Sequence, residues 1–182
     1  MFDSDYVSLM LYIFITNCEK VMFFQAVYRS EPAAQKESAP GLAYFHIPLP
    51  EFNTFNEQNI VGVKKEDVCT ANVNSGFFAT MLEAGDVKAV FVGHDHVNDF
   101  CGNMFGINLC YGGGVGYHAY GLAGWSRRTR VVLASLEADG GGWHGVNKIE
   151  TWKRLDDVSL TIIDEEVLWS SVNPVEETVS TI

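Results

Sequence analysis

The sequence is poor in basic residues and has no long apolar run. Only 12 of its 182 residues are lysine or arginine, against 23 aspartates and glutamates, which gives a formal net charge of -11 at pH 7. Such a chain has no broad basic face for nucleic acid or an anionic membrane. The apolar stretch Tyr6 to Thr16 holds about eleven residues, whereas a bilayer-spanning helix needs roughly twenty. We therefore expect neither a nucleic-acid nor a membrane partner.

The cysteines and the first residues leave the compartment open. The four cysteines show no Cys-x-x-Cys spacing and are too few for a disulfide scaffold. Cys101 and Cys110 can form a local bridge in an oxidising compartment, but two buried thiols are the commoner state and the one we expect. Residues 1–5 contain two acids where a signal peptide carries basic residues. By default the chain is expected in the cytoplasm, with secretion as the alternative.

The composition predicts one globular domain with short additions at both ends. Apolar residues make up 47% of the chain and aromatic residues 13%, enough for a sizeable core. Glu31 to Pro40 is polar and contains proline, as linkers do. Residues 1–40 are therefore expected to form an atypical N-terminal segment and linker, residues 41–170 the domain, and residues 171–182 a tail. Within the first part, Tyr6 to Thr16 predicts a buried helix or strand rather than a signal.

The pattern after residue 40 predicts an α/β (α+β-like) fold dominated by strands. Val87 to Val92 is continuously apolar, which is typical of a buried strand. Ser75 to Ala84 has apolar residues at helical spacing between an Asn74 cap and Gly85, so it predicts a helix over that strand. Residues 52–72 are polar and predict irregular chain. Further strands are expected at 42–47, 109–111, 130–136, 146–155 and 159–163.

Three histidines carry the chemical signal. His94 and His96 lie two residues apart directly after the predicted buried strand, and His46 lies at the end of the first strand of the domain. Neutral imidazole is a good ligand for zinc, iron or manganese. Gly93 allows a sharp turn that aims both following histidines outward from the strand end. The pattern predicts a metal site, and the alternative is that these are surface or hydrogen-bonded core histidines.

Three polar residues surround the histidine pair. Asp95, Asn98 and Asp99 offer carboxylate and amide oxygens that can orient the N–H groups of metal-bound imidazoles. The alternative for each of them is a solvated polar turn.

Three other features receive a structural interpretation. Arg127, Arg128 and Arg130 form the only basic cluster, which we expect to be a solvated turn before a strand. Gly112 to Gly116 is followed by aromatic residues where a phosphate-binding loop would open a helix, so it predicts close backbone packing beside the histidines. His118 is a further residue that could face a substrate pocket.

Four separated motifs resemble plant purple-acid-phosphatase-type proteins, which are calcineurin-like metallophosphoesterases. Gly93 to His96 is similar to the Gly-His-x-His motif of that family, and His46 to the single histidine that precedes it. The resemblance runs from about Ala39 to Trp169, and its motifs follow the family's order. The matching stretches are Gly41 to Phe52, Asn74 to Phe78, Val92 to Phe100 and Tyr111 to Gly114.

The resemblance implies a two-metal centre that hydrolyses phosphate monoesters. In the family iron is paired with zinc or manganese, and the ions lie roughly 3.5 Å apart to clamp the phosphate. By position, His46 and His94 would bind one ion and His96 the other, and no catalytic residue is assigned. The family's earlier Asp-x-His, Gly-Asp-x-x-Asp and Gly-Asn-His motifs have no counterpart before His46. Because their carboxylates are missing, we expect doubtful metal occupancy and a truncated, weakly active or inactive phosphatase.

The resemblance also implies the C-terminal half of a two-sheet sandwich with flanking helices. One inner sheet face would then lose its partner, which favours self-association through that face. The expected substrate is a phosphate monoester or a phosphoprotein. Two alternatives stay open: a non-catalytic interaction module that keeps the half-fold, and a structural zinc held by His94, His96 and Cys101.

Overall fold

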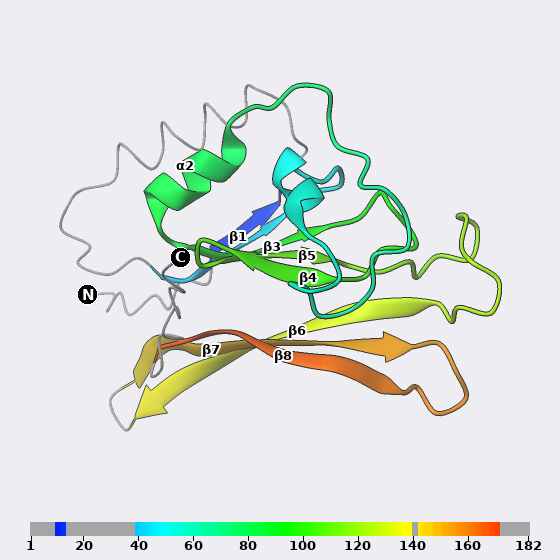
Figure 1. Ribbon diagram of the computed structural model, residues 1–182. Coiled ribbons are helices and arrows are strands. Elements are labelled where there is room, and N and C mark those ends of the chain that lie inside the picture. The colour runs from blue at the N-terminus through cyan, green and yellow to red at the C-terminus, as the bar shows by residue number, and fades with distance from the viewer. Residues whose placement is uncertain (1–9, 14–38, 140–141, 172–182) are drawn as a thin grey trace.

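The computed structural model describes residues 10–13, 39–139 and 142–171 (Figure 1). Most of the predicted N-terminal segment and linker, and almost all of the predicted tail, lie outside the described residues, so the three-part division stays a prediction. Within the described ranges no helix has the length and apolar character needed to cross a bilayer. The regular elements are β1 (Met10–Ile13), β2 (Gly41–Tyr44), the 3-10 helix η1 (Pro50–Thr54), α2 (Phe77–Ala84), β3 (Val87–Val92), β4 (Cys101–Met104), β5 (Ile107–Tyr111), β6 (Arg128–Asp139), β7 (Gly142–Leu155) and β8 (Ile162–Ser170).

The strands form two sheets. The mixed sheet has the order β1-β2-β3-β5-β4, in which only β4 runs antiparallel to its neighbour. The antiparallel sheet has the order β6-β7-β8. Helix α2 lies on one face of the mixed sheet and the antiparallel sheet on the other (Figure 1). The expected α/β (α+β-like) two-sheet architecture is confirmed.

Side-chain alternation along β3 divides the core in two. Val90 and Val92 pack with α2 and η1, whereas Ala89 and Phe91 point to the antiparallel sheet, as period-2 geometry requires. The second core includes Ile149 of β7, so both sheets contribute to it. The inner face that was expected to lack a partner is therefore covered, within the described part of the chain, by the other sheet.

Helix α2 begins two residues later than predicted. Gly76 adopts a left-handed conformation (φ 71°), and its N–H donates to Asn74 Oδ1, so a turn occupies the expected first residues. At the other end Gly85 is left-handed (φ 74°) and its N–H donates to Met81 O, which confirms the predicted stop. The helix buries Phe77, Phe78 and Met81 against β3, as its apolar spacing indicated.

Strand prediction succeeded where the apolar signal was local. Val87–Val92 is found with the predicted bounds, but β4 and most of β8 were missed. The strand predicted at 159–163 overlaps β8 at residues 162–163 and was wrong before that, because Leu160 adopts a positive φ of 49° in a turn. Pro50 opens the 3-10 helix η1, because its fixed φ suits the first turn.

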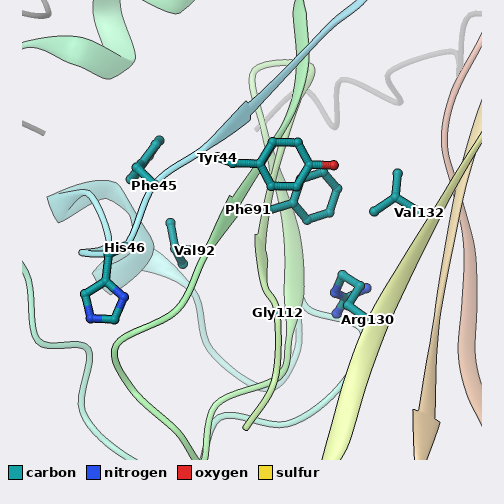
Figure 2. A pocket seen from close by; sticks show the side chains of 8 residues that line it. All are labelled: Tyr44, Phe45, His46, Phe91, Val92, Gly112, Arg130 and Val132. Atoms are coloured by element: carbon teal, nitrogen blue, oxygen red, sulfur yellow. The ribbon is translucent and has the colours of Figure 1, made fainter. Parts of the chain in front are cut away.

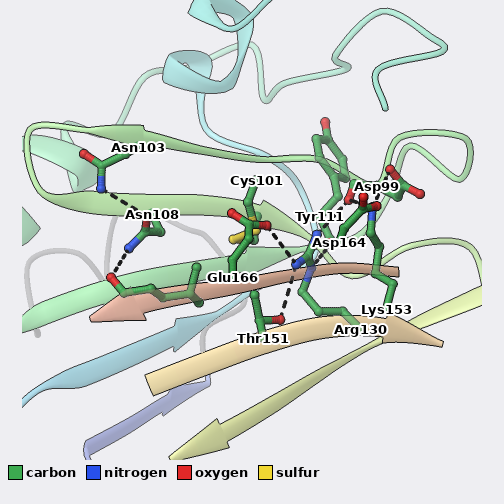
Figure 3. Close-up of a disulfide and its surroundings, with 12 residues drawn as sticks. Asp99, Cys101, Asn103, Asn108, Tyr111, Arg130, Thr151, Lys153, Asp164 and Glu166 are labelled. Carbon is green, nitrogen blue, oxygen red and sulfur yellow. Dashed lines mark hydrogen bonds and ion pairs between the residues drawn. A yellow bond between two sulfur atoms is a disulfide. The ribbon is translucent and has the colours of Figure 1, made fainter. Parts of the chain in front are cut away.

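A cluster of buried ion pairs joins the two sheets, and Figure 3 shows its members Asp99, Lys153 and Asp164. Asp99 is 0% exposed, and its carboxylate lies 2.9 Å from Arg128 Nη1 and 2.9 Å from Lys153 Nζ. Lys153, also 0% exposed, reaches Asp164 at 2.5 Å. The expectation of a solvated basic turn was wrong for Arg128, because its side chain at the start of β6 faces the interior and pairs with the buried Asp99 carboxylate.

The Arg130 side chain also faces the interior of the sandwich, and the acid nearest to it is Glu166. Its guanidinium donates to the carbonyl oxygens of Tyr111 (2.8 Å) and Asp99 (2.7 Å). Glu166 Oε1 lies 3.9 Å from Arg130 Nη1, which is beyond hydrogen-bond distance. Burial raises the pKa of Glu166 to about 7, although the nearby cations Arg130 and Lys153 act to lower it.

The predicted pair of thiols is a disulfide. Cys101 of β4 and Cys110 of β5 are directly opposite each other across an antiparallel pair and are bonded (Figure 3). Sequence spacing favoured free thiols because they are commoner, but the tight turn between the strands brings the two Cα atoms within 4.1 Å.

Candidate metal centre

The topology brings His46 and His94 together. Their strands β2 and β3 are parallel neighbours, so the carboxyl ends of both strands open at the same edge, and each histidine follows its strand by two residues. His46 Nε2 lies 3.3 Å from His94 Nδ1, and the two rings are nearly perpendicular at 83°. His46 is exposed and His94 half-buried, so solvent reaches the pair.

The backbone at the histidine loop, residues 93–99, differs from the expected turn. His94 itself adopts the left-handed conformation, with φ 73°, which is uncommon for a residue with a Cβ. Gly93 has a different role: its N–H donates to His46 O at 3.1 Å, and a Cβ there would lie 3.4 Å from His46 Nδ1. The hydrogen bond joins the two strand ends, and a Cβ at Gly93 would make an ordinary contact there.

His96 points into a different environment. Its ring stacks on Tyr120 with centroids 4.1 Å apart, and its Nδ1 lies 3.2 Å from Tyr120 O. The His96 backbone N–H also donates to the Tyr120 hydroxyl at 3.0 Å. In the described part of the chain, no group of three potential ligands with mutually close donor atoms includes His96.

Asn98 and Asp99 anchor a second segment to the histidine loop. Asn98 Oδ1 accepts the backbone N–H groups of Lys65 (2.9 Å) and Glu66 (3.1 Å), and Asp99 Oδ1 accepts that of Val63 (2.7 Å). Both side chains are fully buried. They neither orient an imidazole nor form a solvated turn, so both interpretations from the sequence were wrong for these two residues.

Asp95 is likewise buried and holds the same segment further along. Its Oδ2 accepts the Tyr111 hydroxyl at 2.6 Å and the Cys69 backbone N–H at 3.1 Å. Burial, and then the hydrogen bond to the Asp95 carboxylate, raise the pKa of Tyr111 far above its ordinary value, so the phenol remains a donor. The expected solvated turn was wrong for Asp95 as well, and no described contact joins this carboxylate to an imidazole N–H.

One compact group of potential metal ligands is found in the described residues. Cys69, His94 and Asp95 offer a sulfur, a nitrogen and an oxygen that all lie within 4.8 Å of one another. The sequence analysis missed Cys69, because an isolated cysteine 25 positions before the histidine carries no ligand spacing. The structural zinc with Cys101 is excluded here, since the sulfur of that residue is in a disulfide.

The glycine-rich stretch packs beside the histidine loop, as predicted. A Cβ on Gly114 would overlap the carbonyl oxygen of His96. Gly113, with φ 82°, would place a Cβ 2.9 Å from Arg128 Cγ. These glycines therefore allow a close backbone contact rather than a phosphate cradle.

A mainly apolar cleft of about 400 Å³ lies next to His46, between the sheets (Figure 2). Tyr44 and Phe91 stack on one side with ring centroids 4.9 Å apart, and Val132 and Arg130 of β6 lie opposite. The guanidinium of Arg130 already donates to backbone carbonyls, so the cleft presents an aromatic wall rather than an anion site.

The fold and the edge position of the histidines define the class. The mixed sheet packs on an antiparallel sheet, a Gly-His-x-His loop follows β3, and a single histidine follows the neighbouring parallel strand β2. This combination defines a calcineurin-like metallophosphoesterase domain.

No family model matches the chain. Relatives were found among curated proteins. The chain is 59% identical over 146 residues to "Probable inactive purple acid phosphatase 29" of Arabidopsis thaliana.

Two further relatives agree. Over 147 residues the chain is 53% identical to "Probable inactive purple acid phosphatase 14" of Arabidopsis thaliana, and over 145 residues it is 35% identical to "Phosphatase DCR2" of Saccharomyces cerevisiae. The matches cover 79%, 80% and 73% of this chain. The chain belongs to the purple-acid-phosphatase-type proteins, as the motifs indicated.

The matched region is a minor share of each relative. The chain spans 38%, 37% and 24% of the lengths of these three proteins. The comparison therefore supports a phosphatase-family relationship and leaves catalytic activity undecided.

Proposed function

We propose that this chain binds phosphate monoesters through a metal ion at the His46–His94 edge and hydrolyses them slowly or not at all. The observation that carries the proposal is the 3.3 Å separation of His46 Nε2 and His94 Nδ1. Two nitrogen atoms about 2.05 Å from one tetrahedral ion lie roughly 3.3 Å apart, so the pair fits a single ion. His96 would serve a second ion of the iron and zinc or iron and manganese pair that the family implies.

The donors present argue for weak catalysis. A bound ion would neutralise phosphate charge and polarise its oxygens. His46 and His94 are neutral donors that position such an ion but do not offset its charge. In the described residues Asp95 is the one carboxylate grouped with a histidine, and His46 is not part of that group. The names of two relatives include the word inactive, in line with this expectation.

The cleft beside His46 supports an ester with an apolar organic group. Tyr44 and Phe91 offer a flat aromatic surface at the side of the cleft nearest to β2 and β3. An aryl phosphate could place its ring there and its phosphate near His46. A phosphorylated tyrosine of a protein substrate has the same chemistry.

Metal loading and phosphate binding test the proposal. The chain is loaded with iron, zinc or manganese, its metal content is measured, and binding of inorganic phosphate and turnover of a generic aryl phosphate are followed. We expect phosphate binding that depends on metal, is lost in His94→Ala and is kept in His144→Ala, with turnover near background. Two ions per chain with rapid turnover would refute slow hydrolysis, and absence of metal-dependent phosphate binding would refute the function itself.

A non-catalytic interaction module is the second candidate. Leu133 of β6 and Val167 of β8 flank Glu150 in one row on the outer face of the antiparallel sheet, and they are 45% and 53% exposed. Such a face favours self-association or a protein partner. Size-exclusion chromatography would then show a dimer or complex that Leu133→Ser disrupts, with no effect of replacing His94.

The disulfide supports the secreted alternative for the compartment. Bonded cysteines persist in oxidising environments and are rare in the cytosol. We infer that the protein works where the Cys101–Cys110 bond is maintained.

A further inference from the structure

We infer that zinc binds this chain through Cys69, His94 and Asp95, a set in which His46 is not a ligand. The three donor atoms lie within 4.8 Å of one another, close enough for small side-chain adjustments to bring them onto one ion. The His46 ring lies beside His94, but His46 is not part of this group of three ligands. The inference concerns zinc ligation and does not rest on phosphate binding.

The three ligands come from two segments that are already held together. The Cys69 N–H donates to Asp95 Oδ2, which places the cysteine beside the carboxylate. Asn98 fixes the preceding turn through the N–H groups of Lys65 and Glu66. Among the described contacts, both hydrogen bonds of Asp95 end on Oδ2, so Oδ1 remains for an ion. The loop therefore positions its donors before metal arrives, which lowers the ordering cost.

The donor chemistry favours zinc over the harder ions of the family. A thiolate and a carboxylate offset the charge of Zn²⁺, whereas His46 and His94 supply only neutral nitrogen. Cys69 is the free cysteine of the described chain and is exposed, so its thiol proton can pass to solvent when the metal–sulfur bond forms. Three protein ligands leave a fourth tetrahedral position open, as in zinc sites that hold water or substrate.

Cobalt substitution distinguishes the two donor sets. The reduced-Cys69 protein, with its disulfide intact, is titrated with Co²⁺ alone and then with Zn²⁺. We expect a thiolate-to-cobalt charge-transfer absorption that zinc abolishes. Cys69→Ser should lose this absorption and bind zinc at least tenfold more weakly, while His46→Ala should keep both properties. Cys18→Ser is the matched control for thiols elsewhere and should behave as the parent chain.

Several results would overturn the inference. One is a charge-transfer band that survives in Cys69→Ser, and another is a band that disappears in Cys18→Ser. The third is a zinc affinity that falls as much in His46→Ala as in Cys69→Ser. If Cys69→Ser does not fold, X-ray absorption of the zinc-loaded parent decides, since one sulfur neighbour at about 2.3 Å is required. Phosphate binding by the manganese-loaded Cys69→Ser protein reports on the proposed function separately and should persist.

Discussion

Replacing Asp99 with asparagine should destabilise the protein more than any other single charge removal in the described ion pairs. Its carboxylate accepts the Val63 N–H at 2.7 Å and lies 2.9 Å from both Arg128 and Lys153. Asp99→Asn keeps the size and one acceptor oxygen, so no cavity forms. What it removes is the negative charge between two buried cations.

The expected loss follows from what remains. Breaking a buried ion pair by removing one partner costs about 3–5 kcal/mol, because the other charge stays buried without compensation. Here Lys153 keeps Asp164 at 2.5 Å, whereas the other described partners of Arg128 are uncharged: the carbonyl oxygen of Ser126 and the ring of Trp125. We therefore expect about 3 kcal/mol, the lower part of that range.

Urea unfolding followed by circular dichroism measures the effect. The half-buried pair formed by Lys148 and Glu150 supplies the control, and Lys148→Ala should cost less than about 1 kcal/mol because solvent screens this pair. Adding Arg128→Met to Asp99→Asn should recover part of the loss, because the cation left without a carboxylate partner is then gone. A loss below about 1 kcal/mol for Asp99→Asn would refute the view that this carboxylate holds the sheets together.

Three further outcomes are expected. The pKa of Glu166 is raised to about 7, above its unfolded value, so the folded state holds that proton more tightly and the free energy of unfolding should fall as pH rises from about 4.5 to 7. In pH-dependent urea melts Glu166→Gln should remove on the order of 2 kcal/mol of this fall, and an unchanged fall would contradict the assignment. Gly114→Ala should lower the melting temperature and reduce the free energy of unfolding by about 1–3 kcal/mol, because its Cβ would overlap backbone of the histidine loop. Gly116→Ala is the control, since a Cβ there meets nothing within 4 Å. Equal melting temperatures for the two variants would count against the close contact. Replacing Cys101 and Cys110 together with serine should reduce the free energy of unfolding by about 2–3 kcal/mol. Alkylation before and after reduction, measured by mass spectrometry, should show two sulfurs that react only after reduction. Alkylation of both without reductant would disprove the bond.

Local patterns predicted local structure well. Val87–Val92 and the end of α2 at Gly85 were read correctly because apolar continuity and a left-handed glycine act over a few residues. Strand β8 was missed because its acidic residues resemble a loop. Glu166 lies on the inner face of the sandwich, near Arg130, so its place in a strand depends on a distant partner.

The candidate site also combines features that the local sequence predicted with features that depend on distant contacts. The spacing of His94 and His96 after a buried strand predicted a histidine loop at a sheet edge, and parallel pairing of β2 and β3 placed His46 there. That pairing joins residues far apart in sequence. No spacing rule could have added Cys69, since its position comes from hydrogen bonds between two loops.

The sequence by itself determined the order of the motifs and, through their resemblance to a family, the family and the two-sheet architecture. Each motif is a short run of residues that can be recognised without knowing which distant segments it contacts. Tertiary structure alone decided the environments. It stacked His96 on Tyr120, buried Arg128 against Asp99, and set Cys69 beside Asp95. The physical reason is that charge burial and ligand geometry depend on which distant segments meet, and only the folded chain brings them together.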